Sequence, residues 1–190
     1  MKLFVGLGNP GKEYVGTRHN MGYEVIDRFA EMAGGVFDKT GFKGIYGIIK
    51  NPAFKEPIII CKPETFMNLS GECVKPLADY FKIDVSDIVI VYDEMALPEG
   101  QIRLREGGSS GGHKGIANII QLFGTEKIKR IRVGIGEPPH HNPIDYVLSK
   151  PNAESFAKID AAIADAAKAL RDIEIKSFEY AMSIYNGKKG

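Results

Sequence analysis

The sequence of 190 residues predicts a single three-layer α/β domain, spanning 1–190, in which a twisted mixed β-sheet is flanked by helices. Three observations support this fold class. Strand-like and helix-like segments alternate along the chain. Segment 87–92 is almost continuously apolar, as expected when both faces of a sheet are covered. Apolar residues at helical spacing between Phe156 and Leu170 predict a long helix that packs against this sheet.

The predicted strands are short apolar or alternating runs separated by turn residues. In chain order they cover 2–7, 44–50, 57–61, 87–92, 101–106 and 130–135. The first strand alternates only weakly, which favours a buried position. Asn51 and Pro52 separate the second strand from the third. The alternating segment 101–106 is typical of an edge strand or a strand of a mixed sheet.

The predicted helices show apolar residues three or four positions apart. They cover 21–33, 65–81 and 113–123, followed by the long helix through 156–170 and a short one through 178–185. In the first helix the apolar face includes Val25, Ile26 and Phe29, and in the second it includes Val74 and Leu77. Helices between successive strands predict a sheet with parallel pairs.

Composition excludes several classes of protein. The hydrophobic share of 44% and the charged share of 26% are typical of a soluble globular protein. No apolar run is long enough to span a membrane, and the first residues do not resemble a signal peptide. Cys61 and Cys73 are too few for a disulfide framework and predict thiols in a reducing cytoplasm. We therefore expect a cytoplasmic protein.

Charge is unevenly distributed along the chain. The net charge is only +1, but segment 101–132 contains seven basic and two acidic residues. A basic surface on a nearly neutral protein indicates a bound polyanion, although a solvated basic face gives the same pattern.

Three segments carry the residues expected to form a site. The segment from Thr17 to Asn20 contains His19 and follows a probable strand and the glycine-rich turn 6–11. The other two segments are 62–71, which contains Asn68, and 93–98, which begins with Asp93. A histidine, a carboxylate and amides are suited to activating a water molecule and orienting a carbonyl group.

Other motifs fit less well. Glycines 6, 8 and 11 match a dinucleotide-binding fingerprint, but Pro10 opposes the helix that must follow at once. Segment 108–112 matches a nucleophile elbow with Ser110, so a serine esterase is an alternative. His140 or His141 would have to serve as its base, and the available acids are poorly placed. No metal-binding spacing of histidines and cysteines is present.

Six segments together resemble bacterial peptidyl-tRNA hydrolases, in the order of that family. They are spread over most of 3–136 and are 5–14, 17–20, 65–71, 93–98, 111–115 and 130–136. The resemblance implies a single α/β domain that cleaves the ester between a peptide and the 3′ end of tRNA. It implies a peptidyl-tRNA partner and no metal or organic cofactor. We also expect a monomer that does not associate with a membrane.

The resemblance also assigns roles. It implies that His19 is the catalytic base, that Asp93 orients it, and that Asn9 distinguishes a blocked amino group. The other expected contacts of the substrate or the tRNA are Tyr14, Phe66, Met67, Asn68, Arg103, Arg105, His113, Lys114 and Arg132. Of these, Phe66 and Met67 are expected to form an apolar wall and His113 to shape the glycine loop.

Two points stay open. The family often has asparagine after Gly-Gly-His, where this chain has Lys114. We predict that Lys114 contacts the backbone near the tRNA 3′ end. A non-catalytic RNA-binding relative of the same fold is a further alternative, although the His19–Asp93 pair argues against it.

Overall fold

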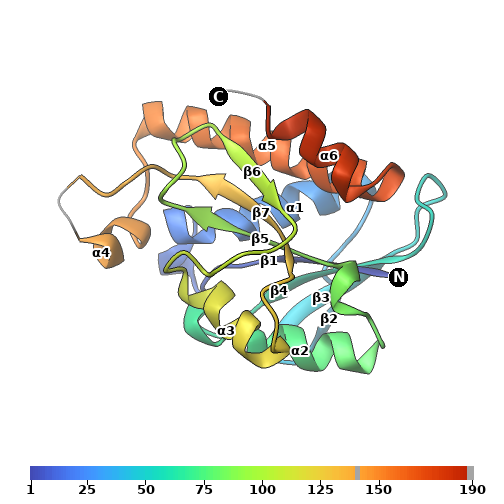
Figure 1. Cartoon of the computed structure of the whole chain (residues 1–190). Helices are drawn as coiled ribbons and strands as arrows, with labels where there is room; N and C mark the ends of the chain where they lie inside the picture. Colours follow the sequence, from blue (N-terminus) through green and yellow to red (C-terminus); the bar gives the residue numbers. More distant parts are fainter. Residues whose placement is uncertain (140–141, 188–190) are drawn as a thin grey trace.

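A mixed β-sheet forms the centre of the molecule (Figure 1). The computed structural model describes residues 1–139 and 142–187, and in this part of the chain the sheet has seven strands in the order β2-β3-β4-β1-β5-β7-β6. The strands are β1 (Lys2–Gly6), β2 (Lys39–Gly41), β3 (Gly44–Ile49), β4 (Ile58–Pro63), β5 (Ile88–Glu94), β6 (Ile102–Arg105) and β7 (Lys129–Gly134).

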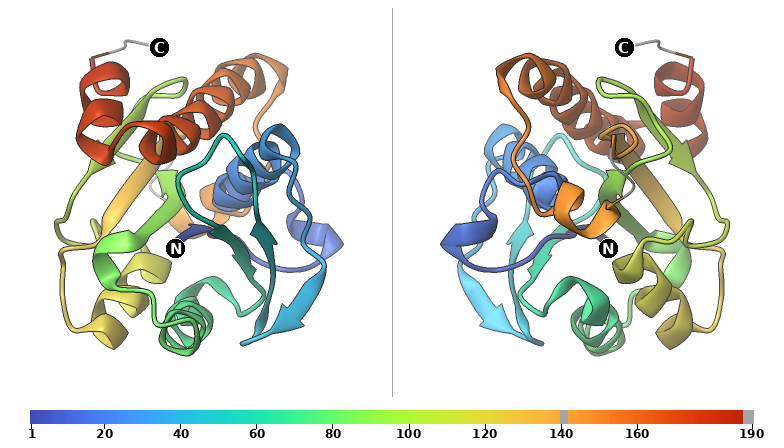
Figure 2. Two further views of the ribbon diagram at one scale, coloured as in Figure 1. Left: turned by 90° about the vertical axis from the view of Figure 1, so that its right-hand side faces the viewer. Right: turned by 90° about the vertical axis from the view of Figure 1, so that its left-hand side faces the viewer.

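Helices cover both faces of this sheet, which confirms the predicted three layers (Figures 1 and 2). They are α1 (Met21–Ala33), α2 (Gly71–Tyr80), α3 (Lys114–Phe123), α4 (Pro143–Val147), α5 (Ala153–Ile175) and α6 (Phe178–Tyr185). Helices α1, α5 and α6 share one buried apolar core with the sheet, and α2 and α3 share the other. Among the described residues, no helix is long and apolar enough to cross a membrane.

The four central strands, β4, β1, β5 and β7, are parallel, so their carboxyl ends lie along the same side of the sheet. Strand β1 is parallel to β4 and β5, and β5 is parallel to β7. Strands β3 and β6 run antiparallel to their neighbours, so the sheet is mixed, as predicted. The carboxyl ends of parallel strands are where open α/β sheets bind ligands. The loops after β1, β4 and β5 carry the residues that the sequence singles out.

Two glycines bring α1 directly against this edge. A Cβ atom on Gly6 would lie 2.1 Å from the carbonyl oxygen of Gly22, and one on Gly22 would lie 2.4 Å from that of Val91. Any larger residue would therefore push α1 away from β1 and β5. The close approach fixes the short 3₁₀ turn Arg18–Asn20, which precedes α1, beside the end of β5.

Most predicted elements are present, and the largest error is at 65–81. The α-helix there begins only at Gly71 and follows a 3₁₀ turn, Met67–Leu69. The reason is a tertiary contact, because the side-chain oxygen of Asn9 accepts a hydrogen bond from the main-chain N–H of Met67 at 2.8 Å. Strand β2 and helix α4 were not predicted, since segments of three and five residues show no periodicity.

Candidate active site

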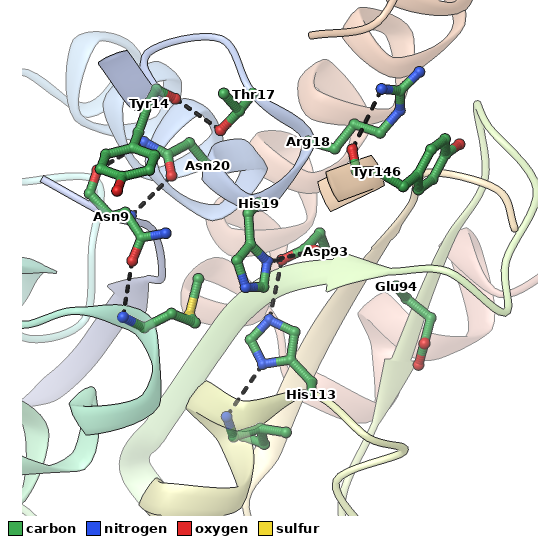
Figure 3. Close-up of polar contacts among 12 residues, drawn as sticks. Asn9, Tyr14, Thr17, Arg18, His19, Asn20, Asp93, Glu94, His113 and Tyr146 are labelled. Atoms are coloured by element: carbon green, nitrogen blue, oxygen red, sulfur yellow. Dashed lines mark hydrogen bonds and ion pairs between the residues drawn. The ribbon is translucent and has the colours of Figure 1, made fainter. Parts of the chain in front are cut away.

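Asp93 connects two histidines at the carboxyl end of β5 (Figure 3). His19 Nδ1 lies 2.8 Å from Asp93 Oδ2 and 3.0 Å from Oδ1. On the opposite side, His113 Nε2 lies 3.0 Å from Oδ1. The carboxylate is almost completely buried, whereas the side chain of His19 is 14% exposed. The sequence predicted the His19–Asp93 pair but not that His113 binds the same carboxylate.

The charge of Asp93 determines how the protons are placed. Burial alone would raise the pKa of Asp93, but its electrostatic interactions with His19 and His113 and the hydrogen bonds from their rings hold it well below its usual value. An ionised carboxylate can only accept hydrogen bonds, so both ring nitrogens that contact it carry hydrogen. His19 therefore has its lone pair on Nε2 when the ring is neutral, which is the form of a general base.

His113 has a second partner that fixes its own tautomer. Its Nδ1 accepts a hydrogen bond from the main-chain N–H of Ile116 at 3.2 Å, which caps the start of α3. Nδ1 must therefore be unprotonated, and the proton must be on Nε2, where it is donated to Asp93.

The same three side chains have the composition of a metal site. The potential ligand atoms of His19, Asp93 and His113 lie within 4.8 Å of one another. A metal ion on Nε2 of His113 would move the ring proton to Nδ1, where it would meet the N–H of Ile116. Two donors would then face each other, so the local chemistry favours a chain of hydrogen bonds over metal ligation.

Asn9 belongs to a network of amides. Its main-chain N–H donates to Asn20 Oδ1 at 2.8 Å, and Asn20 Nδ2 donates to the Asn9 carbonyl at 2.9 Å. The side-chain oxygen of Asn9 is taken by the N–H of Met67, so the N–H₂ group of Asn9 is left to face the site (Figure 3). The network holds this donor in one orientation.

A cavity of about 520 Å³ opens beside the histidines. It is lined by most of the residues that the sequence predicted, namely Asn9, Tyr14, His19, Phe66, Met67, Asn68, Asp93, His113 and Lys114. Glu94 and Met95 from segment 93–98 and the glycines at 111 and 112 also line it. The sequence did not indicate the remaining residues of the wall, which are Pro143, Ile144, Val147 and Leu148. The glycines adopt positive φ angles of 60° and 86°, which allow the loop to turn into α3 without side chains that would fill the cavity.

Phe66 and Met67 differ in their surroundings. The Phe66 side chain is 60% exposed, whereas Met67 is 5% exposed and packs in the apolar core beneath α2 and α3. A large exposed aromatic residue at the rim of a cavity is available for stacking. Met67 forms part of the floor of the cavity and part of the core.

The three predicted phosphate-binding arginines do not line this cavity. Within residues 1–139 and 142–187, two of them have a hydrogen-bond or ion-pair partner and Arg105 has none. Arg132 is 8% exposed, and its Nη1 atom lies 3.1 Å from Glu94 Oε1. Arg103 donates a hydrogen bond to the carbonyl of Asn186 at 3.3 Å. Arg105 is exposed at the end of β6. A phosphate contact by Arg132 would require the ion pair to rearrange, which the sequence could not indicate.

The serine-esterase alternative receives no support from the geometry. Ser110 lies in the glycine loop, where its carbonyl accepts a hydrogen bond from the N–H of His113. Its hydroxyl makes no hydrogen bond to a residue that the structure describes. His140 and His141, the bases considered for this alternative, lie outside the described residues.

The fold and the site together define the class of this protein. A histidine held by a buried carboxylate, with amides beside it and a cavity in front of it, lies at the carboxyl edge of the sheet of one α/β domain. Such a set of groups is typical of a hydrolytic enzyme that uses water directly.

The chain belongs to the peptidyl-tRNA hydrolase family. The sequence model of this family, "Peptidyl-tRNA hydrolase", matches residues 3–190. Two curated relatives with that name, from Geobacillus kaustophilus (strain HTA426) and Geobacillus thermodenitrificans (strain NG80-2), are 46% and 48% identical over 187 residues. Each match covers 98% of this chain and 100% of the relative.

A solved structure agrees with this assignment. The crystal structure of peptidyl-tRNA hydrolase from Acinetobacter baumannii superposes with a TM-score of 0.92 at 33% identity. The superposition covers 100% of this chain and 96% of the other. The resemblance drawn from six short segments is therefore confirmed over the whole chain, and the protein is a hydrolase of this family.

Proposed function

We propose that this protein hydrolyses the ester between a peptide, or an N-blocked amino acid, and the 3′ end of tRNA, with His19 as the general base. The observation that carries the proposal is the His19–Asp93 pair beside a cavity of about 520 Å³, with Nε2 of His19 free of the carboxylate. The family to which the chain belongs supports the choice of substrate.

In this mechanism a water molecule is the nucleophile. Neutral His19 takes a proton from the water at Nε2 as its oxygen attacks the ester carbonyl carbon, and Asp93 stabilises the imidazolium that forms. The tetrahedral intermediate then expels the ribose oxygen, which receives the same proton from His19. The products are a peptide with a free carboxyl group and tRNA with a free hydroxyl. The step needs no cofactor.

The developing oxyanion requires hydrogen-bond donors. The N–H₂ group of Asn9, held by Met67 and Asn20, is one candidate, and the exposed amide of Asn68 at the cavity wall is the other. Losing one such donor costs on the order of 3 kcal/mol of transition-state stabilisation. Because its side-chain oxygen is occupied, Asn9 can offer the substrate only N–H.

The surrounding residues divide between the two parts of the substrate. Phe66 is available to stack on the terminal base, and Tyr14 lines the same cavity. Lys114 is exposed at the first turn of α3 and supplies a cation for the nearby phosphate. Arg105 would bind a phosphate farther from the ester. Arg103 and Arg132 would join it only if tRNA displaced their internal partners, Asn186 and Glu94.

His113 takes a different role from direct tRNA contact. Because its ring donates to Asp93 and accepts from Ile116, we assign it to fixing the position of the carboxylate. It still forms part of the cavity wall. A cytoplasmic location stays a prediction, supported by the family's place in translation. A monomeric state also stays a prediction.

One assay tests the proposal. The protein is incubated with one tRNA that carries either N-acetyl-leucine or leucine with a free amino group, and deacylation is measured. We expect rapid release from the blocked substrate and little from the free one. Binding of tRNA without release of either amino acid would instead identify a non-catalytic RNA-binding protein.

A further inference from the structure

Arg18, the residue before His19, attaches helix α4 to the catalytic loop. Its main-chain N–H donates to the carbonyl of Ser149 at 3.0 Å, and its Nη1 donates to Ser149 Oγ at 2.6 Å. Its guanidinium carbon also lies 4.1 Å from the centroid of the Tyr146 ring (Figure 3). The side chain of Arg18 donates its hydrogen bonds to Tyr146 and Ser149, which follow it by 128 and 131 positions in the sequence.

Tyr146 is held from the other side as well. Its hydroxyl donates to the carbonyl of Ile135 at 2.5 Å, just after β7. The ring is thus placed between the guanidinium group and the edge of the sheet. Helix α4 has only five residues, and a helix of this length is not stable by itself. Its position therefore depends on these tertiary contacts.

The position of α4 matters because α4 supplies the apolar side of the cavity. Ile144, Val147 and Leu148 line the cavity, and Ile144 and Leu148 are 59% and 39% exposed. Exposed side chains of this size on one short segment indicate a surface that binds an apolar group.

Charge indicates which part of the substrate lies there. Helix α4 carries one acidic residue, Asp145, and no basic one, whereas Lys114 lies at the start of α3. Glu94 also lines the cavity, although Arg132 offsets part of its charge. Acidic groups disfavour the phosphates of the tRNA. The apolar wall is therefore better suited to the peptide than to the nucleic acid.

We propose that Arg18 is a positioning residue that holds the α4 wall against the catalytic loop, and that this wall selects peptidyl groups whose esterified residue has a large apolar side chain. The proposal rests on the function proposed above and adds a preference to it. Arg18 acts through α4 and does not contact the reacting atoms.

The test compares two substrates on one tRNA, acylated with N-acetyl-leucine or with N-acetyl-glycine. In the unaltered protein we expect kcat/KM to favour leucine by about tenfold, the lower end of what one apolar contact gives. Arg18→Gln should raise KM for the leucine substrate until this preference is lost, with kcat and its pH profile unchanged. Arg18→Lys should behave similarly, because lysine keeps the charge but cannot make the same set of contacts.

Variants of Tyr146 and Ser149 distinguish loss of the contacts that Arg18 makes with α4 and the residues after it, here called the tether, from a general failure to fold. Tyr146→Phe keeps the ring beneath Arg18 but loses the hydrogen bond to Ile135, so it should weaken the preference only in part. Tyr146→Ala also removes the ring and should reproduce Arg18→Gln. Ser149→Ala removes the closest acceptor and should weaken the preference even if Arg18→Gln does not fold.

The outcomes are distinct. Equal losses of kcat for both substrates with a changed pH profile would show that Arg18 acts on His19, and an unchanged preference in all the variants would show that the tether has no role in selection. Weaker binding of uncharged tRNA by Arg18→Gln would assign the arginine to phosphate. Absence of hydrolysis of either substrate by the unaltered protein would refute the proposed function itself.

Discussion

Asp93 supports two imidazole rings at once, and this sharing defines the chemistry at the scale of single residues. Each ring donates one hydrogen bond to the carboxylate, and neither can rotate without leaving a buried acceptor unsatisfied. Among the described residues, His19 Nε2 has no hydrogen-bond partner, whereas the second nitrogen of His113 accepts from the N–H of Ile116. The two histidines therefore have unequal roles.

Replacing His19 by alanine tests this assignment. We expect kcat to fall by about 10²–10⁴-fold, the usual contribution of a general base, while affinity for uncharged tRNA stays the same. Asp93→Asn should also reduce kcat strongly, because an amide no longer fixes the basic tautomer. Single-turnover rates and a filter-binding titration measure the two effects separately, and near-normal hydrolysis by His19→Ala would refute the mechanism.

Arg105 and Arg132 form a matched pair for testing tRNA contacts. Arg105→Gln should reduce the slope of log K against log salt by about one, because an exposed arginine can bind phosphate as it stands. Arg132→Gln should leave the slope unchanged, since Arg132 is paired with Glu94. Binding titrations between low and moderate salt measure both, and a lower slope for Arg132→Gln would show that tRNA displaces Glu94.

Lys114 gives a third prediction at this scale. It is exposed and lines the cavity at the first turn of α3, where a positive charge opposes the helix dipole. Lys114→Ala should raise KM severalfold with only a modest fall in kcat, because a flexible cation aids binding more than chemistry. Steady-state kinetics show the split, and a loss of kcat as large as that of His19→Ala would place Lys114 in the catalytic machinery.

At the scale of elements, the free edge of β6 is closed by a side chain. Asn186 Oδ1 accepts a hydrogen bond from the N–H of Leu104 at 2.7 Å, and its Nδ2 donates to the Leu104 carbonyl at 3.0 Å. The amide thus imitates a neighbouring strand and connects the end of α6 to the sheet. Edge strands without such cover offer their polar groups to other chains.

Removing this amide should destabilise the protein without affecting the site. Asn186→Ala leaves both backbone groups of Leu104 without their partner and should lower the free energy of unfolding by about 1–3 kcal/mol. Urea denaturation measures the loss, and kcat should stay unchanged because Asn186 does not line the cavity. Asn152→Ala, which removes only the cap of α5, is the matched control, with an expected loss of about 1 kcal/mol.

The buried Asp93 also affects the molecule as a whole, through the pH dependence of stability. Its pKa is lower in the folded protein than in the unfolded chain, so the unfolded chain binds more protons between the two values. The ionised Asp93 therefore contributes its full share to the free energy of unfolding above the pKa of the unfolded chain, about 4. This contribution decreases as pH falls below that value.

Denaturation at several pH values isolates this contribution. Between pH 6 and pH 3 the stability of the unaltered protein should fall more steeply than that of Asp93→Asn, because the variant has no carboxylate to protonate at this position. Glu56, whose pKa is also lowered by Lys2 and the N-terminal amine, is present in both proteins and cancels in the comparison. Parallel curves would show that the two histidines do not stabilise the charged form of Asp93.

The sequence by itself determined the class of fold, most elements and most residues of the cavity. Helix α1 was predicted with the boundaries that the structure has, because its apolar spacing directly reflects which face is buried. The family was determined by short segments whose residues are needed at the site. Patterns of this kind are local in the sequence, so they can be recognised without the tertiary structure.

Only the tertiary structure decided which of these residues act on one another. His19 and Asp93 are 74 positions apart, and their contact depends on how β5 lies beside β1 and on the approach of α1. Three other contacts depend on the tertiary structure in the same way. Asp93 also binds His113, Arg132 is paired with Glu94, and Arg18 binds the segment of α4. Each is a contact between loops that meet at the edge of the sheet, and no periodicity within one segment specifies such a meeting.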